Sequence, residues 1–463
     1  MTRRWRVPTV AWMAILLWGG VAAASEAPRG EKPEPESPEP RADRARGYVE
    51  PRSTEPEDVA LFVPRLVLTV PRYALKVVFF PILGTIAFLD RHAVIEHVED
   101  FLYNDARTAG VVPVLSADTF FGPTFGVRAF HDDFGGHRER ASVEARFGGR
   151  YEQAYQIEFR GDRVGGSRLW LESLARFERE PQLLFQGIGH PPELSSGRRL
   201  DPRGAAVASR FREQRFLSLL RLGYTAGRQG SLAKFGFTAI YNQRSFGAAA
   251  DAADPATESV YDTSRLPGYA EGFSTVEMDV SLVVDTRDAA GATSSGIYFE
   301  VFAGGVPPLR EYGFWHHGLE ATGYVNLYAK TRVLIARLTL EGVEGPWARI
   351  PFSELPRMGG PHRLRGYPLD RFRDEKLALA TLEYRYPVHQ YVAGALHVDV
   401  GRVAKDYENL FRVRDWVVGV GGGLVFRSRS TRLFAVNLAY GEGLQLHVTT
   451  DPLRAFATRD TEL

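Results

Sequence analysis

Three charged side chains have the spacing most suggestive of a specific interaction: Arg365, Glu383 and Asp399. Arg365 lies in the loop GGPHRLRGYPLDRF (359–372), and the two carboxylates lie on the polar sides of the two strand-like segments that follow. A planar guanidinium forms paired hydrogen bonds with two carboxylates, which a lysine ammonium cannot imitate. We therefore predict that this loop folds inward, that Arg365 binds both acids, that Gly366 turns the backbone tightly and that Tyr367 packs the loop tip.

Two histidine groups are the next candidates for chemistry. His316 and His317 are neighbours on a predicted strand, so their side chains point to opposite faces and a shared metal site is disfavoured. His397 shares a face with Asp399, but no third ligand with suitable spacing is evident. The sequence has no cysteine, which excludes thiolate sites and disulfides, and it has no G-x-S-x-G hydrolase motif. We predict no metal, no cofactor and no enzymatic activity.

The segments that must position these side chains alternate between apolar and polar residues. From residue 109 to 450, about sixteen segments of roughly ten residues show this alternation, which is typical of strands long enough to cross a bilayer. Even positions such as Leu382, Leu396 and Val398 are apolar, whereas the odd positions between them carry charge. A soluble sandwich would also alternate. The length and even number of strands favour an all-β fold, a transmembrane antiparallel β-barrel.

The ends of the chain have a different composition. Residues 1–24 have a basic start, an apolar stretch and a small-residue cleavage site, which predicts a signal peptide rather than a retained anchor. Residues 25–58 are rich in Pro and Glu and predict a disordered spacer. Residues 59–108 are apolar but broken by prolines, which favours short amphipathic helices over one membrane span. Residues 451–463 form a polar C-terminal tail.

The order of these motifs resembles the BamA/TamA family of outer-membrane barrels, the bacterial surface antigen family. The family's loop motif is matched by Leu364-Arg365-Gly366-Tyr367, and its two acidic strand positions are matched by Glu383 and by Asp399-Val400-Gly401. A turn containing Asp285 and Arg287, followed by Gly296, also fits the family pattern. An earlier loop adds a further glycine motif, Phe185-Gln186-Gly187-Ile188-Gly189.

The resemblance implies a protein of the outer membrane of a Gram-negative bacterium that inserts polypeptides into that membrane or moves them across it. Its implied partners are membrane lipid and unfolded polypeptide. In that family the seam between the first and last strands can open, and Gly419 and Gly421–Gly423 would soften the wall near it. No POTRA domain is expected before residue 109, so a passive pore or an anchoring barrel is the alternative. The 59–105 segment could also join two copies.

The balance of 57 basic to 56 acidic residues excludes a nucleic-acid partner.

Overall fold

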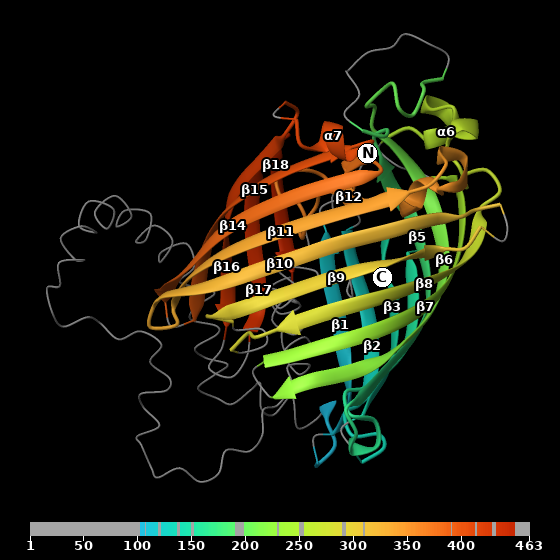
Figure 1. Cartoon of the computed structure of the whole chain (residues 1–463). Helices are drawn as coiled ribbons and strands as arrows, with labels where there is room; N and C mark the ends of the chain where they lie inside the picture. The colour runs from blue at the N-terminus through green and yellow to red at the C-terminus, as the bar shows by residue number, and fades with distance from the viewer. Residues whose placement is uncertain are drawn as a thin grey trace, which may run out of the picture.

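The chain forms a barrel of sixteen antiparallel strands, seen in the computed structural model of Figure 1. The structure describes residues 102–449, apart from 107, 119–121, 137–138, 150–151, 190–198, 229–230, 250–253, 289–292, 309–310, 390, 413 and 428–431. Each strand pairs with the strand before and after it around the wall. The expected all-β fold and the expected number of barrel strands are confirmed.

The strands of the wall are longest in its first half and shortest at its end. The first eight are β1 (Ala109–Asp118), β2 (Gly122–His131), β3 (Arg140–Phe147), β4 (Gln153–Gly161), β5 (Leu169–Phe185), β6 (Ser209–Arg228), β7 (Ser231–Ala248) and β8 (Phe273–Asp285). The second eight are β9 (Gly296–Val306), β10 (Phe314–Tyr328), β11 (Arg332–Glu344), β14 (Lys376–His389), β15 (Val392–Ala404), β16 (Val417–Arg427), β17 (Arg432–Tyr440) and β18 (Leu444–Thr449).

Short elements occupy the connections between these strands. The helical turns are η2 (Val164–Gly166), α6 (Thr257–Val260), η3 (Thr263–Arg265), η4 (Trp347–Arg349), η5 (Phe352–Glu354) and α7 (Tyr407–Leu410). A separate two-stranded sheet pairs β12 (Arg357–Met358) with β13 (Phe372–Arg373). Both strands of this small sheet belong to the connection between β11 and β14.

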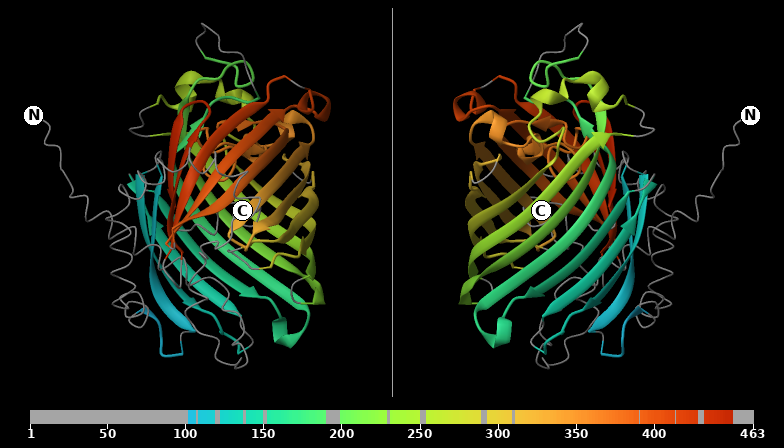
Figure 2. Two further views of the ribbon diagram at one scale, coloured as in Figure 1. Left: turned by 90° about the vertical axis from the view of Figure 1, so that its left-hand side faces the viewer. Right: turned by 90° about the vertical axis from the view of Figure 1, so that its right-hand side faces the viewer.

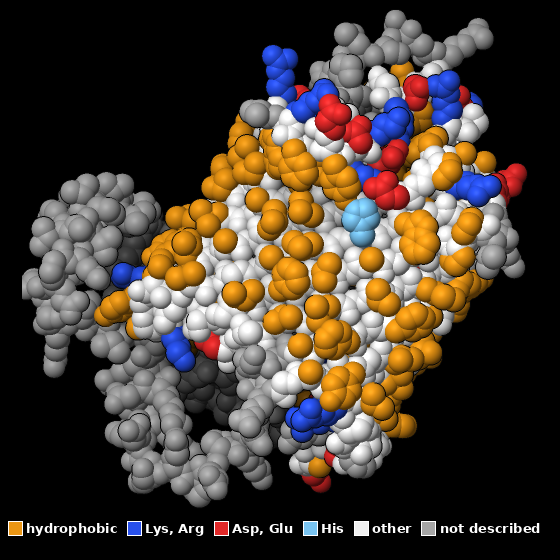
Figure 3. Space-filling view, viewed as in Figure 1, with side chains coloured by type: hydrophobic (Ala, Val, Ile, Leu, Met, Phe, Trp, Pro, Cys, Tyr) orange, Lys and Arg blue, Asp and Glu red, His pale blue; other side chains and the backbone are white. Residues whose placement is uncertain are grey.

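The outer face of the wall is apolar and the inner face is polar. Apolar side chains cover the wall in Figure 3, while charged side chains gather at its upper end. Val280 of β8 and Leu382 of β14 are 59% and 51% exposed, whereas the odd-numbered Glu383 on β14 is 3% exposed. In a soluble protein the apolar face of a sheet points toward the core, whereas here it points outward. This arrangement suits a surrounding lipid phase. In β14 to β16 the even-numbered apolar residues, such as Leu382, Leu396 and Val398, point outward, as predicted.

The long connections of the barrel lie at one end, the upper end in Figures 1 and 2. They are 186–208, 249–272 and 345–375, and together with nearby strand ends they form an apolar core that includes Phe185, Tyr261 and Phe352. We call residues 345–375 the lumen loop. It is the longest connection in the described part of the chain, and its residues contact inward-facing side chains from β7 to β18.

The seam where the sheet meets itself is narrow. Among the described residues, β1 and β18 pair only at Ala117 with Val448, whereas β1 and β2 pair along the full length of both strands. The strands are antiparallel, and the paired residues lie near the C-terminal end of each, so the upper end of β1 meets the lower end of β18. As a result β1 extends lower than the last strands do, as Figure 2 shows.

Several expectations concern the ends of the chain. The signal peptide (1–24), the spacer (25–58), nearly all of the 59–108 segment and the 451–463 tail lie outside the described residues. Within the described ranges, no helix combines the length and the apolar character required to cross a bilayer. Tyr103 pairs with Gly110 just before the barrel wall.

The apolar outer face leads to a prediction at Val280, which lies within β8 and points outward. Val280→Arg should lower the free energy of unfolding by about 2–4 kcal/mol in bilayers, because a charge at the bilayer midplane is poorly solvated. Urea titration of the protein folded into lipid vesicles measures this difference. The control Val280→Leu should change stability by less than about 1.5 kcal/mol. Equal stability of Val280→Arg and the parent protein would mean that this face does not meet lipid.

Candidate functional site in the barrel interior

Arg365, at the tip of the lumen loop, lies between two carboxylates of the barrel wall. Its Nε and Nη2 donate to Oδ2 and Oδ1 of Asp399 at 3.0 and 2.9 Å, and its Nη1 donates to Oε2 of Glu383 at 2.7 Å. The backbone N–H of Arg365 also donates to Asp399, at 3.0 Å. These three side chains, which we call the Arg365 cluster, are 5%, 3% and 1% exposed for Arg365, Glu383 and Asp399. Sequence reasoning identified all three members.

Further hydrogen bonds hold the two carboxylates of the Arg365 cluster. Thr381 donates to Asp399 at 2.8 Å, and Arg385 donates to Glu383 at 2.8 Å. Burial disfavours the charged form of Arg365, but Asp399 and Glu383 more than offset this effect and raise the pKa of the guanidinium above its ordinary value. Each charged group of the cluster thus has hydrogen-bond partners of opposite charge, as a buried charge requires.

The backbone of the motif differs from the expectation in one respect. The residue with a left-handed conformation is Leu364, at φ 61°, and not Gly366. Leu364 is 1% exposed and packs in the apolar cluster under the loop, which supports an otherwise unfavourable conformation. Gly366 is needed for a different reason: a Cβ at this position would lie 2.6 Å from the carbonyl oxygen of Tyr440. The glycine thus allows the loop to touch the wall, rather than allowing the chain to turn.

The same motif binds the last three strands. Tyr367 packs on Phe372 with ring centroids 5.3 Å apart, and its hydroxyl donates to the carbonyl of Val418 on β16 at 3.3 Å. His447 of β18 contacts the carbonyl oxygen of Arg365 through Nε2 at 3.0 Å. The backbone N–H of Glu442, in the turn between β17 and β18, donates to the carbonyl of Gly366 at 3.2 Å. Three motif residues, Arg365, Gly366 and Tyr367, therefore connect the loop to the last strands before the seam.

Other charged contacts of the lumen loop were missed by sequence reasoning. Arg363 donates twice to Glu341 of β11, at 2.6 and 2.9 Å, and Glu354 accepts from Asn242 of β7 at 3.2 Å. Glu354 also pairs with Arg244 of β7 at 3.2 Å. Glu341 has an odd number, as the inward-facing residues of β14 do, which could have indicated that it points inward. The partners of Glu354 on β7 are more than a hundred residues away along the chain, so no local pattern indicates them.

The remaining motif residues fall into two places. Gly401 of β15 makes room for the loop, because a Cβ there would lie 2.7 Å from Sδ of Met358. The Phe185–Gly189 motif also contacts the loop, since Gly189 donates its N–H to the carbonyl of Arg373 at 2.8 Å. Asp285 and Arg287 are not part of the Arg365 cluster. They pair with each other at 2.7 Å in the turn between β8 and β9, at the other end of the barrel.

His316 and His317, adjacent on β10, point to opposite faces of the wall, as neighbours on a strand must. His316 faces inward beside Glu277 and Asp279 of β8, a grouping that sequence reasoning did not find. His317 instead contacts the hydroxyl of Tyr407 in α7. His397 and Asp399 do share the inner face of β15, and both are buried.

Comparison with known proteins gives one family and several similar folds. The model of the Omp85 superfamily domain matches residues 133–441. The structure of BamA from Haemophilus ducreyi lacking POTRA domains 1-3 is similar to 74% of this chain, over 69% of its own length, with a TM-score of 0.52 and 12% sequence identity. At this identity the likeness concerns the fold alone. No curated protein sequence matches the chain.

Two structures of CdiB are also similar in part. CdiB from Escherichia coli matches with 10% identity and a TM-score of 0.49, and CdiB from Acinetobacter baumannii with 12% identity and a TM-score of 0.46. They cover 74% and 73% of this chain. The chain spans 61% and 57% of their length, which is less than two thirds of either protein.

The geometry of the Arg365 cluster predicts a large effect of removing the guanidinium. Arg365→Ala should lower the free energy of unfolding by about 3–5 kcal/mol, because it leaves two buried carboxylates without their counter-charge. Arg365→Lys should recover little of this loss, since an ammonium cannot bind Asp399 through two nitrogens while reaching Glu383. Urea titration and the temperature at which heat-modifiable gel mobility is lost measure both variants.

Arg349→Ala is the matched control, because Arg349 is an exposed arginine of the same loop. Arg373 is unsuitable as a control, since it is 2% exposed and lies over the rings of Phe185 and Phe352. Combining Arg365→Ala with Glu383→Gln should cost less than the two single changes summed, because the double variant has one fewer unpaired charge. A strictly additive result would show that the two side chains are not energetically coupled.

Proposed function

The chain belongs to the Omp85 superfamily, and we propose that it inserts polypeptides into, or moves them across, the outer membrane of a Gram-negative bacterium. Barrels of this superfamily are transporters and assembly factors rather than enzymes, in agreement with the absence of an enzymatic motif in the sequence. Relatives in the superfamily are outer-membrane proteins of Gram-negative bacteria, and the apolar outer wall of this barrel supports the same location. Its partners are then membrane lipid and unfolded polypeptide.

The observation that carries the proposal is a contrast: the lumen loop makes many contacts with the last strands, whereas the backbone pairing between β18 and β1 is sparse. The lumen loop is held by the Arg365 cluster on β14 and β15 and by further contacts to β16, to the β17–β18 turn and to β18. At the seam, β18 and β1 share a single paired position within the part of the chain that the structure describes. A loop held in this way would keep the last strands in place while the contact between β18 and β1 opens.

The free edge of β1 gives an incoming polypeptide something to bind. Val111 to Ser116 pair with β2 on one side, and within the described residues no strand pairs with their other side. An unpaired strand edge presents N–H and C=O groups, here without the N–H that Pro113 lacks, and an extended segment can add to it as a new strand. Such an edge suits a polypeptide substrate better than a small solute.

The alternative is a passive pore or an anchoring barrel. The lumen loop reaches inward-facing side chains on both β7 and β18, so it lies across the interior of the barrel. This position disfavours an open pore, and we expect small single-channel conductance in planar bilayers. The proposed pairing of two copies through the 59–105 segment stays a prediction, because that segment lies outside the described residues.

A disulfide across the seam tests the proposal. Ala117 and Val448 are directly opposite in the register, and opposed residues of antiparallel strands have Cα separations of about 4.5–5.5 Å, which a disulfide can bridge. The chain has no cysteine of its own, so Ala117→Cys with Val448→Cys gives one defined bond. Oxidation should stop the protein in proteoliposomes from accelerating the insertion of a urea-denatured outer-membrane barrel, and reduction should restore it.

The matched control places the disulfide in a fully paired part of the wall. Ala321 and Leu338 are opposed on β10 and β11, away from the seam, so their cysteine variants should remain active when oxidised. An oxidised seam variant that still accelerates insertion would contradict opening at this site. Absence of any acceleration by the parent protein, together with ion conductance unaffected by seam oxidation, would instead favour the passive barrel.

A further inference from the structure

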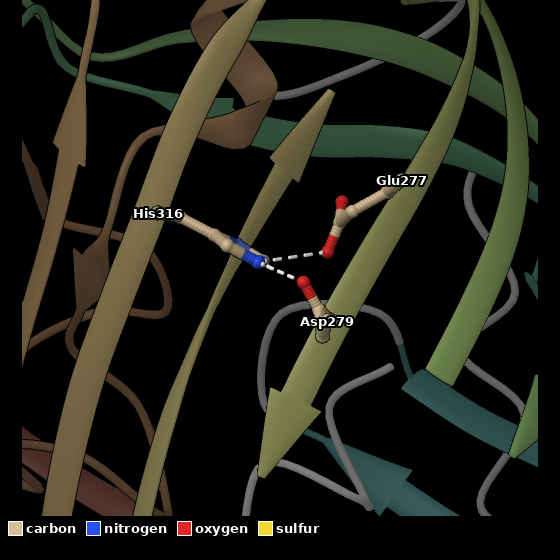
Figure 4. Close-up of side chains that lie close together, drawn as sticks. All are labelled: Glu277, Asp279 and His316. Carbon is tan, nitrogen blue, oxygen red and sulfur yellow. Dashed lines mark hydrogen bonds and ion pairs between the residues drawn. The ribbon is translucent and has the colours of Figure 1, made fainter. Parts of the chain in front are cut away.

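Three potential metal ligands meet on the inner face of the wall, on strands that are not neighbours. Glu277 and Asp279 lie two residues apart on β8 and therefore point to the same side, and His316 reaches them from β10, as Figure 4 shows. Nε2 of His316 lies 2.5 Å from Oδ1 of Asp279 and 3.1 Å from Oε1 of Glu277. The three ligand atoms all lie within 4.8 Å of one another.

The strand between them is shaped to let them meet. β9 separates β8 from β10, and its Gly304 is paired with Asp279 on one side and with His316 on the other. A Cβ at Gly304 would lie 1.9 Å from Oδ1 of Asp279, so any other residue would occupy the place where the carboxylate meets the imidazole. Phe302, two residues before Gly304, packs edge-on against the ring of His316, with centroids 5.6 Å apart, and helps to orient it.

The chemistry of the set fits a divalent transition-metal ion. We propose that Glu277, Asp279 and His316 bind one such ion, of which Zn²⁺ is the natural probe. Imidazole nitrogen with carboxylate oxygens is a ligand set that Zn²⁺ accepts, and three protein ligands are typical of zinc sites that retain water. Two carboxylates offset the charge of the ion, which matters because Glu277 and Asp279 are buried.

Nε2 of His316 faces one oxygen of each carboxylate. A single N–H directs its hydrogen bond best at one acceptor at a time. A metal ion replaces the proton of that N–H and contacts all three groups at once. Glu277 and His316 also border an interior cavity of about 490 Å³, which lets water complete the coordination and lets the ion enter from the lumen.

The position of the site gives the ion a mechanical consequence. β9 lies halfway around the barrel from the seam between β1 and β18. An ion held by β8 and β10 would connect two strands that share no backbone hydrogen bonds, across the strand that separates them. Metal binding should therefore raise the resistance of the folded barrel to heat.

Zinc titration of the full-length protein tests the proposal. The chain is refolded in detergent, stripped with EDTA, freed of the chelator and titrated with Zn²⁺ in a calorimeter. We expect one bound ion per chain. Asp279→Asn or His316→Gln should raise the dissociation constant of this ion by about 100-fold, because changes around a metal site already weaken metal affinity by up to that factor. Zn²⁺ should also raise the temperature at which heat-modifiable mobility is lost in the parent protein but not in these variants.

His317→Gln is the matched control, since His317 is the next residue on the same strand and contacts Tyr407 instead. It should retain the affinity and the thermal shift. The two ligand variants keep nearly the same side-chain size, and their heat-modifiable mobility without zinc verifies that they fold. Two results would overturn the proposal: a parent protein that takes up no Zn²⁺ at micromolar concentration, or uptake that Asp279→Asn and His316→Gln leave unchanged, which would assign the ion to adventitious surface histidines.

Discussion

Arg365 carries a positive charge into the interior of the barrel, and that burial is tolerable only because carboxylates from two neighbouring strands meet it. The lumen loop is thereby given one position. Its tip can approach the wall closely because Gly366 has no side chain, and Leu364 can adopt a strained conformation because it is packed beneath the loop. Ionic contact, close approach and apolar packing depend on one another, so a loop that would otherwise be mobile becomes part of the barrel.

A second constraint acts on the wall itself. In lipid every backbone polar group needs a partner within the protein, which favours a sheet that returns to its first strand. This sheet meets the requirement unevenly: most neighbouring strands pair over many residues, whereas the described residues of β1 and β18 pair at one position. Within the described wall, the region with the fewest backbone pairs is thus adjacent to β18, one of the strands that the lumen loop contacts. This contrast between β18 and the seam is the observation on which the proposed opening of the wall rests.

The opposite side of the barrel has a different character. There β8, β9 and β10 are paired in register over long stretches, and the inner face brings Glu277, Asp279 and His316 together above a glycine. The interior charges of β14 and β15 connect the lumen loop to the wall, whereas those of β8 and β10 connect two strands of the wall to each other. The two groups of charged residues thus stabilise different parts of one barrel, and the cost of burying charge is met in each case by partners from more than one strand.

By itself, the sequence determined the strand number, the inner and outer faces and the partners of Arg365. Alternation is a local property with a period of two residues, so the faces of Glu383 and Asp399 can be read directly from their positions. Only the tertiary structure decided which distant strands share the interior: Glu354 meets β7, His447 meets the loop, and Glu277 meets His316 across β9. These contacts depend on barrel curvature and on the absence of a side chain at Gly304, which no local pattern records.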